Sequence, residues 1–397
     1  MVVQKSIPRI LQAQNSHHNH FSFVDTAVSP HKHDISGDLQ TPLGTRDMAP
    51  NKKAKIPSKI AHQQTDNSPR PRAVSTSTEE SWTLPLEVQQ LVLSTFRHAF
   101  TFDQNVDVKA TIQEVKGFLY NRDFASAFGK QDYLDAYALR WSASRALGYA
   151  AIFTELQAKH DCLERAHVVA DPSDPSASKV VCIGGGAGSE VVALASVVRF
   201  LSLSSINVVA IDIADWSQSL EKLESSMMTP PPLSAYASEA AKAANKSLIE
   251  PGQLSIKCMQ RDILVCAEGE LHTILVGASL CTIMFTLNEL FTSSISLTTA
   301  FLLALTDAIE PGSWLVVVDS PGSYSEVKIG QDANPKQYPM KWLLDHALLK
   351  VAGEKKWEKA VTNDSKWFRM DAKLKYPIEL ENMRYQIHLY QRQSESR

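Results

Sequence analysis

The sequence lacks the features that mark several protein classes. It contains no apolar run approaching about 18 residues, so we expect no membrane span, and no secretory leader follows its start. Its five cysteines show no metal-ligand spacing, and an odd number of thiols, most of them in apolar segments, suits a reducing compartment. At 397 residues, of which 44% are hydrophobic, the chain can still bury at least one sizeable core. We therefore expect no membrane or metal partner.

Aromatic residues are nearly absent from the first 80 positions. Only Phe21 and Phe23 occur there, in a segment rich in Ser, Pro, His, Asn and Gln that lacks the apolar surface to offset ordering entropy. We interpret residues 1–80 as a disordered tail whose histidines form a solvated tract rather than a metal site. A basic cluster at residues 51–59 resembles a nuclear import signal. A weak phosphate-binding arm and a chance cluster are the alternatives.

The chain also lacks the overall basic excess of proteins that grip long duplex nucleic acid. Its net charge is −3, with +3 in residues 1–80 and −6 in the remainder. The basic residues concentrate late, near Trp357 and Trp367, at Lys355, Lys356, Lys359, Lys366, Arg369, Lys373 and Lys375. We expect either a local nucleic-acid patch there or a solvated helix and hairpin face.

The most informative stretch is residues 180–190, a β-branched run followed by closely spaced glycines and an apolar helix at 191–201. This order opens a nucleotide-binding α/β unit, because glycine allows a tight turn and a close approach of ligand to the helix N-terminus. Gly184, Gly186 and Gly188 alternate as in S-adenosylmethionine (SAM) methyltransferases. A dinucleotide oxidoreductase would need Ser189 to replace its third glycine. A glycine-rich surface turn without a ligand is the remaining alternative.

Carboxylates follow the next two predicted strands. The strand at 206–212 ends in Asp212, which can bind a ribose diol in either class or serve as a loop acid or helix cap. The strand at 254–260 leads to Asp262 and Ile263, which stand where methyltransferases hold the adenine amino group and ring. The second pattern favours SAM.

A fourth strand, predicted at 281–286, leads to Asn288 and Glu289. In methyltransferases these positions face the methyl group and its acceptor, so the amide can bind a base edge and the carboxylate can take a proton. Asn288 can instead cap the following helix, which we expect at 295–309 after the turn. The apolar stretch 271–277 duplicates this strand without an evident reason.

The C-terminal part completes the sheet. A strand at 313–319 opens into a small-residue loop, in which Tyr324 is either a stacking residue at the acceptor site or a packed aromatic. Strict alternation over 384–392 predicts a final antiparallel strand at the end of the sheet, partnered by residues 366–370. The fold class is therefore α/β, with a Rossmann-like sheet.

Helical periodicity dominates residues 81–160, which we predict to be an N-terminal helical cap on a SAM-binding domain at 161–397. The long helix at 131–157 carries an aromatic row interrupted by a guanidinium. Arg140, Trp141 and Arg145 either face the core or border the cofactor pocket and touch substrate or the SAM carboxylate. Residues 229–252 form a Pro- and Ala-rich insertion with a helical piece.

Four motifs together resemble the fungal family of large-subunit (25S) ribosomal RNA uridine-N3 methyltransferases, over roughly residues 82–393. They are Arg140-Trp141-Ser142 with Ser144-Arg145-Ala146-Leu147, Cys182-Ile183-Gly184-Gly185-Gly186-Ala187-Gly188, Phe285-Thr286-Leu287-Asn288-Glu289-Leu290-Phe291, and Met383-Arg384-Tyr385-Gln386-Ile387-His388-Leu389-Tyr390. The resemblance implies a class I methyltransferase sheet of seven strands with the last antiparallel. It also implies SAM as cofactor, large-subunit rRNA or the pre-ribosome as partner, and a nuclear or nucleolar location, with the cytoplasm possible.

Carried onto this chain, the resemblance implies that the three glycines wrap SAM, Asp212 holds the ribose and Asp262 the adenine. Asn288 and Glu289 would face the target base, and Glu289 would take the N3 proton. Cys182 departs from the many methyltransferases that carry an acid two residues before the first glycine. The alternatives are an assembly factor with the methyltransferase fold but no catalysis, and a nicotinamide-dependent Rossmann oxidoreductase.

Overall fold

The computed structural model describes residues 82–102, 107–163, 178–203, 205–322, 324–327 and 336–394, with side chains left undescribed at 324–327 and 336–337. The predicted tail, its histidines and its basic cluster lie outside these residues. None of the helices in the described ranges is long and apolar enough to cross a membrane.

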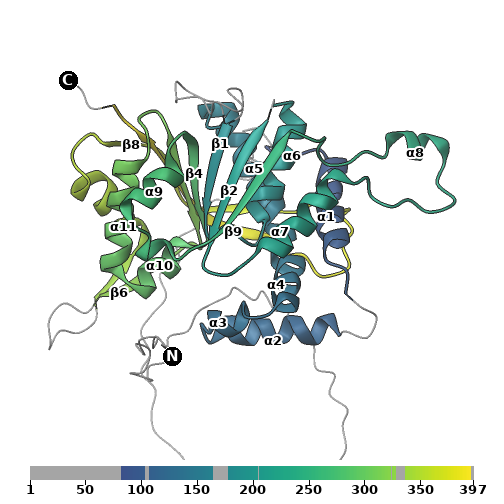
Figure 1. Ribbon diagram of the computed structural model, residues 1–397, viewed down its shortest axis with the longest axis horizontal. Helices are drawn as coiled ribbons and strands as arrows, with labels where there is room; N and C mark the ends of the chain where they lie inside the picture. Colours follow the sequence, from purple (N-terminus) through teal and green to yellow (C-terminus); the bar gives the residue numbers. More distant parts are fainter. Residues whose placement is uncertain are drawn as a thin grey trace, which may run out of the picture. The chain divides into compact units, whose positions relative to one another are not determined.

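Seven strands form one sheet in the order β3-β2-β1-β4-β5-β9-β8 (Figure 1). The five strands from β3 to β5 are mutually parallel, and β9 runs antiparallel to both β5 and β8. The bounds are β1 Ser178–Ile183, β2 Ile206–Asp212, β3 Leu254–Gln260, β4 Ala278–Met284, β5 Trp314–Asp319, β8 Trp357–Phe368 and β9 Met383–Arg392. The predicted seven-stranded class I sheet with an antiparallel last strand is confirmed.

The C-terminal strands differ from the prediction in their arrangement. β9 lies between β5 and β8 rather than at the end of the sheet, and β8 forms the edge. β8 covers 12 residues, whereas only 366–370 was predicted. Most of its side chains are exposed or half-buried, so the strand lacks the apolar alternation by which strands are recognised.

The fourth strand also lies at other residues than predicted. β4 begins at Ala278 and ends at Met284, earlier than the predicted 281–286. The apolar stretch before it belongs to helix α9 (Glu268–Leu275), whose buried residues Leu271, Ile274 and Leu275 recur at helical spacing. Gly277, with φ +74°, supports the turn from this helix into β4.

The helices before β1 are α1 (Leu86–Ala99), α2 (Val108–Tyr120), α3 (Phe124–Ala127), α4 (Gln131–Tyr137) and α5 (Ala143–His160). The predicted long helix comprises α4 and α5, joined by a π-helical turn, Ala138–Ser142. Asp107 starts α2 by accepting hydrogen bonds from the backbone N–H groups of Lys109 at 3.0 Å and Ala110 at 3.1 Å. The short α3 was not predicted.

The remaining elements lie between the strands in the sequence. They are α6 (Ser189–Leu201), α7 (Ser217–Met228), α8 (Glu239–Ala244), a 3₁₀ turn (Ile263–Val265), α10 (Leu287–Ser293), α11 (Ile295–Ala308), α12 (Met340–His346), a second π-helical turn (Ala347–Val351), and the hairpin of β6 (Tyr324–Val327) and β7 (Lys336–Pro339). α8 is the helical piece expected between 229 and 252; it has no buried residue and projects away from the sheet (Figure 1).

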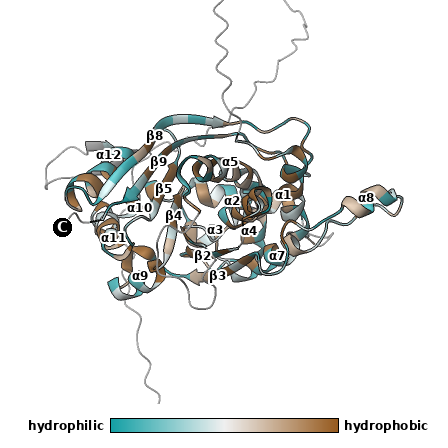
Figure 2. Ribbon diagram, turned by 90° about the horizontal axis from the view of Figure 1, so that it is seen from above, coloured by the Kyte–Doolittle hydropathy of each residue, from teal (hydrophilic) through white to brown (hydrophobic). Residues whose placement is uncertain are grey.

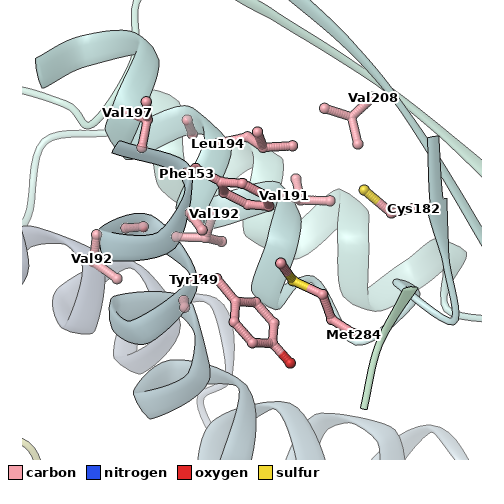
Figure 3. Packing of buried hydrophobic residues seen from close by; sticks show 14 of the residues in the cluster. Val92, Tyr149, Phe153, Cys182, Val191, Val192, Leu194, Val197, Val208 and Met284 are labelled. Atoms are coloured by element: carbon pink, nitrogen blue, oxygen red, sulfur yellow. The ribbon is translucent and has the colours of Figure 1, made fainter. Parts of the chain in front are cut away.

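Hydrophobic clusters cover both faces of the sheet. Alternate residues of β1 enter different clusters, with Val180 and Cys182 on one face and Val181 and Ile183 on the other. The first face is covered by α1, α5, α6 and α7, and the second by α9, α11 and α12. Figure 2 shows α1, α5 and α7 on one side of the strands and α9, α11 and α12 on the other. Figure 3 shows Tyr149 and Phe153 of α5 against α6, close to Cys182 and Met284 of the sheet. The result is a three-layer α/β/α fold.

Candidate cofactor and acceptor site

The glycine turn after β1 packs tightly against two other elements. Gly184 has φ +76°, and a Cβ there would lie 2.2 Å from Thr286 Oγ1. A Cβ at Gly186 would lie 2.1 Å from Trp216 Cδ1 at the start of α7. Both positions therefore require glycine, one for its backbone conformation and one for close approach. Gly188 precedes the first residue of α6, so the turn delivers that helix N-terminus to the carboxyl edge of the sheet.

Asp212, the last residue of β2, is held by this turn. Its Oδ2 accepts a hydrogen bond from the Gly186 N–H at 3.1 Å, and its Oδ1 accepts one from the Ala214 N–H at 3.2 Å. Burial raises the pKa of the Asp212 carboxyl, while these hydrogen bonds lower it. The next residue, Ile213, exposes 61% of its surface at the strand tip. The sequence did not indicate this residue, although its place directly after a strand-end acid makes it a candidate apolar contact for a nucleoside.

The tip of β3 is tied to the tip of β2. The Arg261 N–H donates to the Asp212 carbonyl oxygen at 2.7 Å. Asp262 is exposed, and its Oδ1 accepts a hydrogen bond from the Leu264 N–H at 3.0 Å. Ile263 is 6% exposed and packs in the hydrophobic cluster on one face of the sheet. The two acids proposed for the nucleoside thus lie at adjacent strand ends.

Asn288 lies in the first turn of α10, beyond the end of β4. Its backbone N–H donates to Asp319 Oδ2 at 3.0 Å, which links the ends of β4 and β5. The N-cap of α11 is Ser294 and that of α10 is Thr286, so the interpretation of Asn288 as a helix cap is wrong. The Asn288 amide oxygen is buried without a hydrogen-bond partner in the described part of the chain. A buried acceptor without a donor is costly, so this oxygen is suited to an incoming N–H group.

Glu289 forms an ion pair that the sequence did not indicate. Arg122 Nη2 lies 2.6 Å from Glu289 Oε2, and the two side chains are 32% and 31% exposed. Burial raises the pKa of Glu289, whereas Arg122 and a hydrogen bond with Asn288 lower it. Arg122 follows α2 and has φ +57°. The turn between α2 and α3 therefore reaches the acceptor side of the site, although 167 positions separate the partners.

Arg145 of α5 is surrounded by aromatic groups. Its Nη1 donates to the Tyr137 hydroxyl at 2.8 Å, and its Cζ lies 4.9 Å from the ring centroid of Phe285. Phe285, the residue after β4, has φ +54°, and its ring stacks on Tyr149 at 6.3 Å. Burial alone would lower the pKa of Arg145, but Tyr137 and Tyr149 raise it, so the group is a fixed cation.

The other predicted helix residues lie differently. Trp141 is 8% exposed and belongs to a small cluster with Ile112 and Val115 of α2, which matches the core-facing alternative. Arg140 pairs with Glu381, and its Nη1 is buried without a hydrogen-bond partner among the described residues. The Tyr324 side chain lies outside the described side chains.

Two buried carboxyls that the sequence did not indicate lie beside these residues. Glu190, in the first turn of α6, is 3% exposed, and burial raises the pKa of its carboxyl to about 7. Its Oε1 accepts a hydrogen bond from Thr282 Oγ1 at 3.3 Å. Asp319, at the end of β5, is 4% exposed, and burial raises its pKa to about 6. Arg145 lowers both pKa values and so stabilises both anions.

The predicted late basic patch is only partly at the surface. Trp357 is 5% exposed, and its Nε1 donates to Thr306 Oγ1 at 2.9 Å, so its place in a surface patch was wrong. Trp367, in contrast, is 45% exposed. Lys359 and Lys366 are paired with Asp345 and Glu155. In the parts of the chain that the structure describes, no group of three or more His, Cys, Asp or Glu residues is placed to hold a metal ion.

The ends of β2 and β5 and the first turns of α6 and α10 thus bring together four carboxyls whose pKa values burial raises: Glu190, Asp212, Glu289 and Asp319. Such an environment favours a cationic ligand and opposes the diphosphate of a nicotinamide dinucleotide. SAM carries a sulfonium, an ammonium and a ribose diol, and the residues present fit these groups. The fold and the site together define a class I SAM-dependent methyltransferase.

Comparisons with known proteins agree. Residues 94–391 match the protein family described as "Putative SAM-dependent methyltransferase", and the chain belongs to this family. It is 35% identical over 302 residues to the 25S rRNA (uridine(2843)-N(3))-methyltransferase of Saccharomyces cerevisiae, covering 70% of this chain and 76% of that protein.

Solved structures of low sequence identity also match. A SAM-dependent methyltransferase from Methanosarcina mazei is 11% identical with a TM-score of 0.33, covering 55% of this chain and 94% of that one. A SAM-bound amino pentose methyltransferase from Micromonospora echinaspora is 13% identical with a TM-score of 0.30, covering 62% and 91%.

Proposed function

We propose that this enzyme transfers a methyl group to N3 of a uridine in large-subunit rRNA during ribosome biogenesis. The observation that carries the proposal is the 35% identity to a yeast enzyme of that name over 70% of the chain. The acceptor side of the site supports it, because the amide of Asn288, whose oxygen has no partner among the described residues, lies next to the carboxylate of Glu289. Action on pre-ribosomal RNA is consistent with a nuclear or nucleolar location.

In this proposal the ends of β1, β2 and β3 hold SAM, which supplies an electrophilic methyl group when bound. The turn of Gly184, Gly186 and Gly188 brings the N-terminus of α6 to the carboxyl edge of the sheet, where the cofactor would lie. Asp212 accepts hydrogen bonds from the ribose diol, and Asp262 accepts one from the adenine amino group. Glu190 offers a carboxylate beside the turn, where Cys182 replaces the acid of many relatives, and Arg145 is the cation available to the SAM carboxylate.

The acceptor nitrogen determines what the second half of the site must do. Uridine N3 carries a proton at neutral pH and becomes nucleophilic only as that proton leaves. Glu289 is the proposed general base, and the guanidinium of Arg122 favours its ionised form by lowering a pKa that burial raises. Asn288 holds the base by donating its amide N–H to a uridine carbonyl oxygen beside N3, and its backbone bond to Asp319 holds the first turn of α10 in place.

The test is methylation of an unmodified large-subunit rRNA transcript by the purified chain with SAM. Nucleoside mass spectrometry should detect 3-methyluridine, and a reverse-transcription stop should place it at one position. A Glu289→Gln variant that binds SAM normally but makes no product would support the assignment of the base. Methylation at a different atom or on protein only would refute the proposed acceptor. No methylation of naked RNA or of pre-ribosomes would favour an assembly factor without catalysis.

A further inference from the structure

Trp367 stands out among the aromatic side chains that the site does not use. It lies near the end of the edge strand β8 and is 45% exposed. Two guanidinium groups lie over its ring, with Arg369 Cζ at 4.8 Å and Arg384 Cζ at 5.8 Å from the ring centroid. An exposed indole with two arginines is a surface that can stack on a planar group and bind an anion at the same time.

The charges of these two arginines are not neutralised locally. Neither Arg369 nor Arg384 forms an ion pair within the ranges that the structure describes, whereas the nearby Lys341 pairs with Asp364 at 2.6 Å. Within the described part of the chain, the Arg384 side chain donates a hydrogen bond from its Nε to Ser365 Oγ at 3.1 Å. Guanidinium donors of both arginines therefore remain available to phosphate oxygens.

Strand register places this group at the edge of the sheet that carries the active site. On β9, Gln386 pairs with Asp319 at the end of β5. Arg384, two residues earlier in the chain, pairs with Trp367 of β8. From strand spacing and rise, the Cα atoms of Arg384 and Trp367 lie roughly 8–12 Å from that of Asp319. Asp319 in turn binds the backbone of Asn288.

We infer that Trp367, Arg369 and Arg384 form a clamp for unpaired nucleotides that flank the acceptor uridine. This inference rests on the proposed function, which supplies the RNA. The indole stacks on a base, and the two arginines bind the adjoining phosphates, a combination that single-stranded RNA satisfies without base-specific hydrogen bonds. An acidic peptide would use the two cations but would leave the exposed indole without a partner, so RNA fits the group better.

The test titrates a fluorescein-labelled 12-nucleotide uridine RNA with the full chain and follows fluorescence anisotropy. Trp367→Ala should weaken binding at least about fivefold, and Trp367→Phe should restore most of it, because loss of one stacked base costs this much. Arg369→Gln with Arg384→Gln should reduce the slope of log Kd against log salt by about 1.4, from two lost phosphate contacts on a single strand. Tyr236→Ala, which removes a 96% exposed aromatic from the segment before α8, is the matched control and should change neither quantity.

Calorimetric titration with SAM separates the clamp from the cofactor site, and every clamp variant should keep the wild-type SAM affinity. Equal RNA affinity of wild type, Trp367→Ala and the double arginine variant would overturn the clamp. So would tighter, Trp367-independent binding of a poly-glutamate peptide in the same titration. Trp367-dependent RNA binding by a chain that never methylates uridine would refute the proposed function alone, whereas methylation with Trp367-independent binding would refute the clamp alone.

Discussion

Glu289 is the residue on which the proposed chemistry depends most directly. Its carboxylate lies 2.6 Å from Arg122 and next to the amide of Asn288. Replacing it with glutamine keeps the size and removes the basic group, so we expect the turnover number for uridine methylation to fall by about 10²–10⁴. Single-turnover methyl transfer measures this, with SAM affinity as the control. A loss below about threefold would assign the proton to another acceptor, such as water.

The ion pair of Glu289 predicts a shift in pH dependence. Arg122 lowers a pKa that burial raises, so Arg122→Gln should raise the pKa of Glu289. Because the ionised carboxylate is the active form, activity rises with pH through this pKa. The ascending limb of the pH profile should therefore move to higher pH in the variant, and activity at high pH should approach that of wild type. Arg97→Gln, on the exposed face of α1, is the control. A pH-independent loss of activity would show that Arg122 acts only on structure.

The residues that could be identified from the sequence are those whose positions follow from the succession of strands and turns along the chain. Gly184, Gly186 and Asp212 follow buried strands, and parallel strands end at one edge of a sheet, so their proximity could be predicted. Arg122 and Glu190 could not be identified in this way. The partner of Arg122 lies 167 positions away, and Glu190 resembles any acid in a first helical turn until its burial is known.

At the scale of elements, the central strands were predictable because both sheet faces are covered and each strand is a short β-branched run. The prediction failed where burial is one-sided or absent. The three buried residues of α9 have helical spacing, but Ile274 and Leu275 run directly into the apolar residues that lead to β4, so the boundary between helix and strand was not visible. β8 is an edge strand with mostly polar side chains, so its first nine residues carried no strand signal.

The π-helical turn between α4 and α5 gives a prediction for an element. The connection between β8 and β9 crosses this turn, and the Tyr376 hydroxyl donates to the carbonyl oxygen of Leu139 at 2.8 Å. Tyr376→Phe removes the donor and keeps the ring, so the free energy of unfolding should fall by about 1–2 kcal/mol. Urea denaturation measures this, with the exposed Tyr236→Phe as the control. An unchanged midpoint would mean that water replaces the hydroxyl at no cost.

At the scale of the whole molecule, a cluster of buried acids, which includes Glu190 and Asp319, surrounds one cation, Arg145. Burial raises the pKa values of Glu190 and Asp319 above their ordinary values, and Arg145 compensates only part of this cost. His388 opposes the trend, because burial lowers its pKa to about 4 and it binds fewer protons when folded. The overall pH dependence of stability thus mixes opposite signs, and a single group is best isolated by comparing a variant with the wild type.

Glu190 permits that comparison. The folded-state pKa of about 7 exceeds the ordinary value of 4.5, so the folded protein binds more protons between these pH values, and its stability falls as pH rises through this window. Glu190→Gln cannot ionise, so its free energy of unfolding relative to wild type should increase from pH 4.5 to pH 8, by up to about 3 kcal/mol. Urea denaturation at several pH values measures the difference. A difference independent of pH would show that water reaches the carboxylate in the folded protein.

The same variant should bind SAM less well, because a neutral amide cannot replace a carboxylate near a cationic ligand. A bound cation favours the ionised form of Glu190, so SAM should stabilise the wild type more at pH 8 than at pH 6, and this gain should shrink in Glu190→Gln. Thermal unfolding with and without SAM tests the coupling, and Glu224→Gln on α7 is the control. If both proteins gain equally from SAM at both pH values, the acids are not oriented toward the cofactor, and their burial reflects packing of the turn alone.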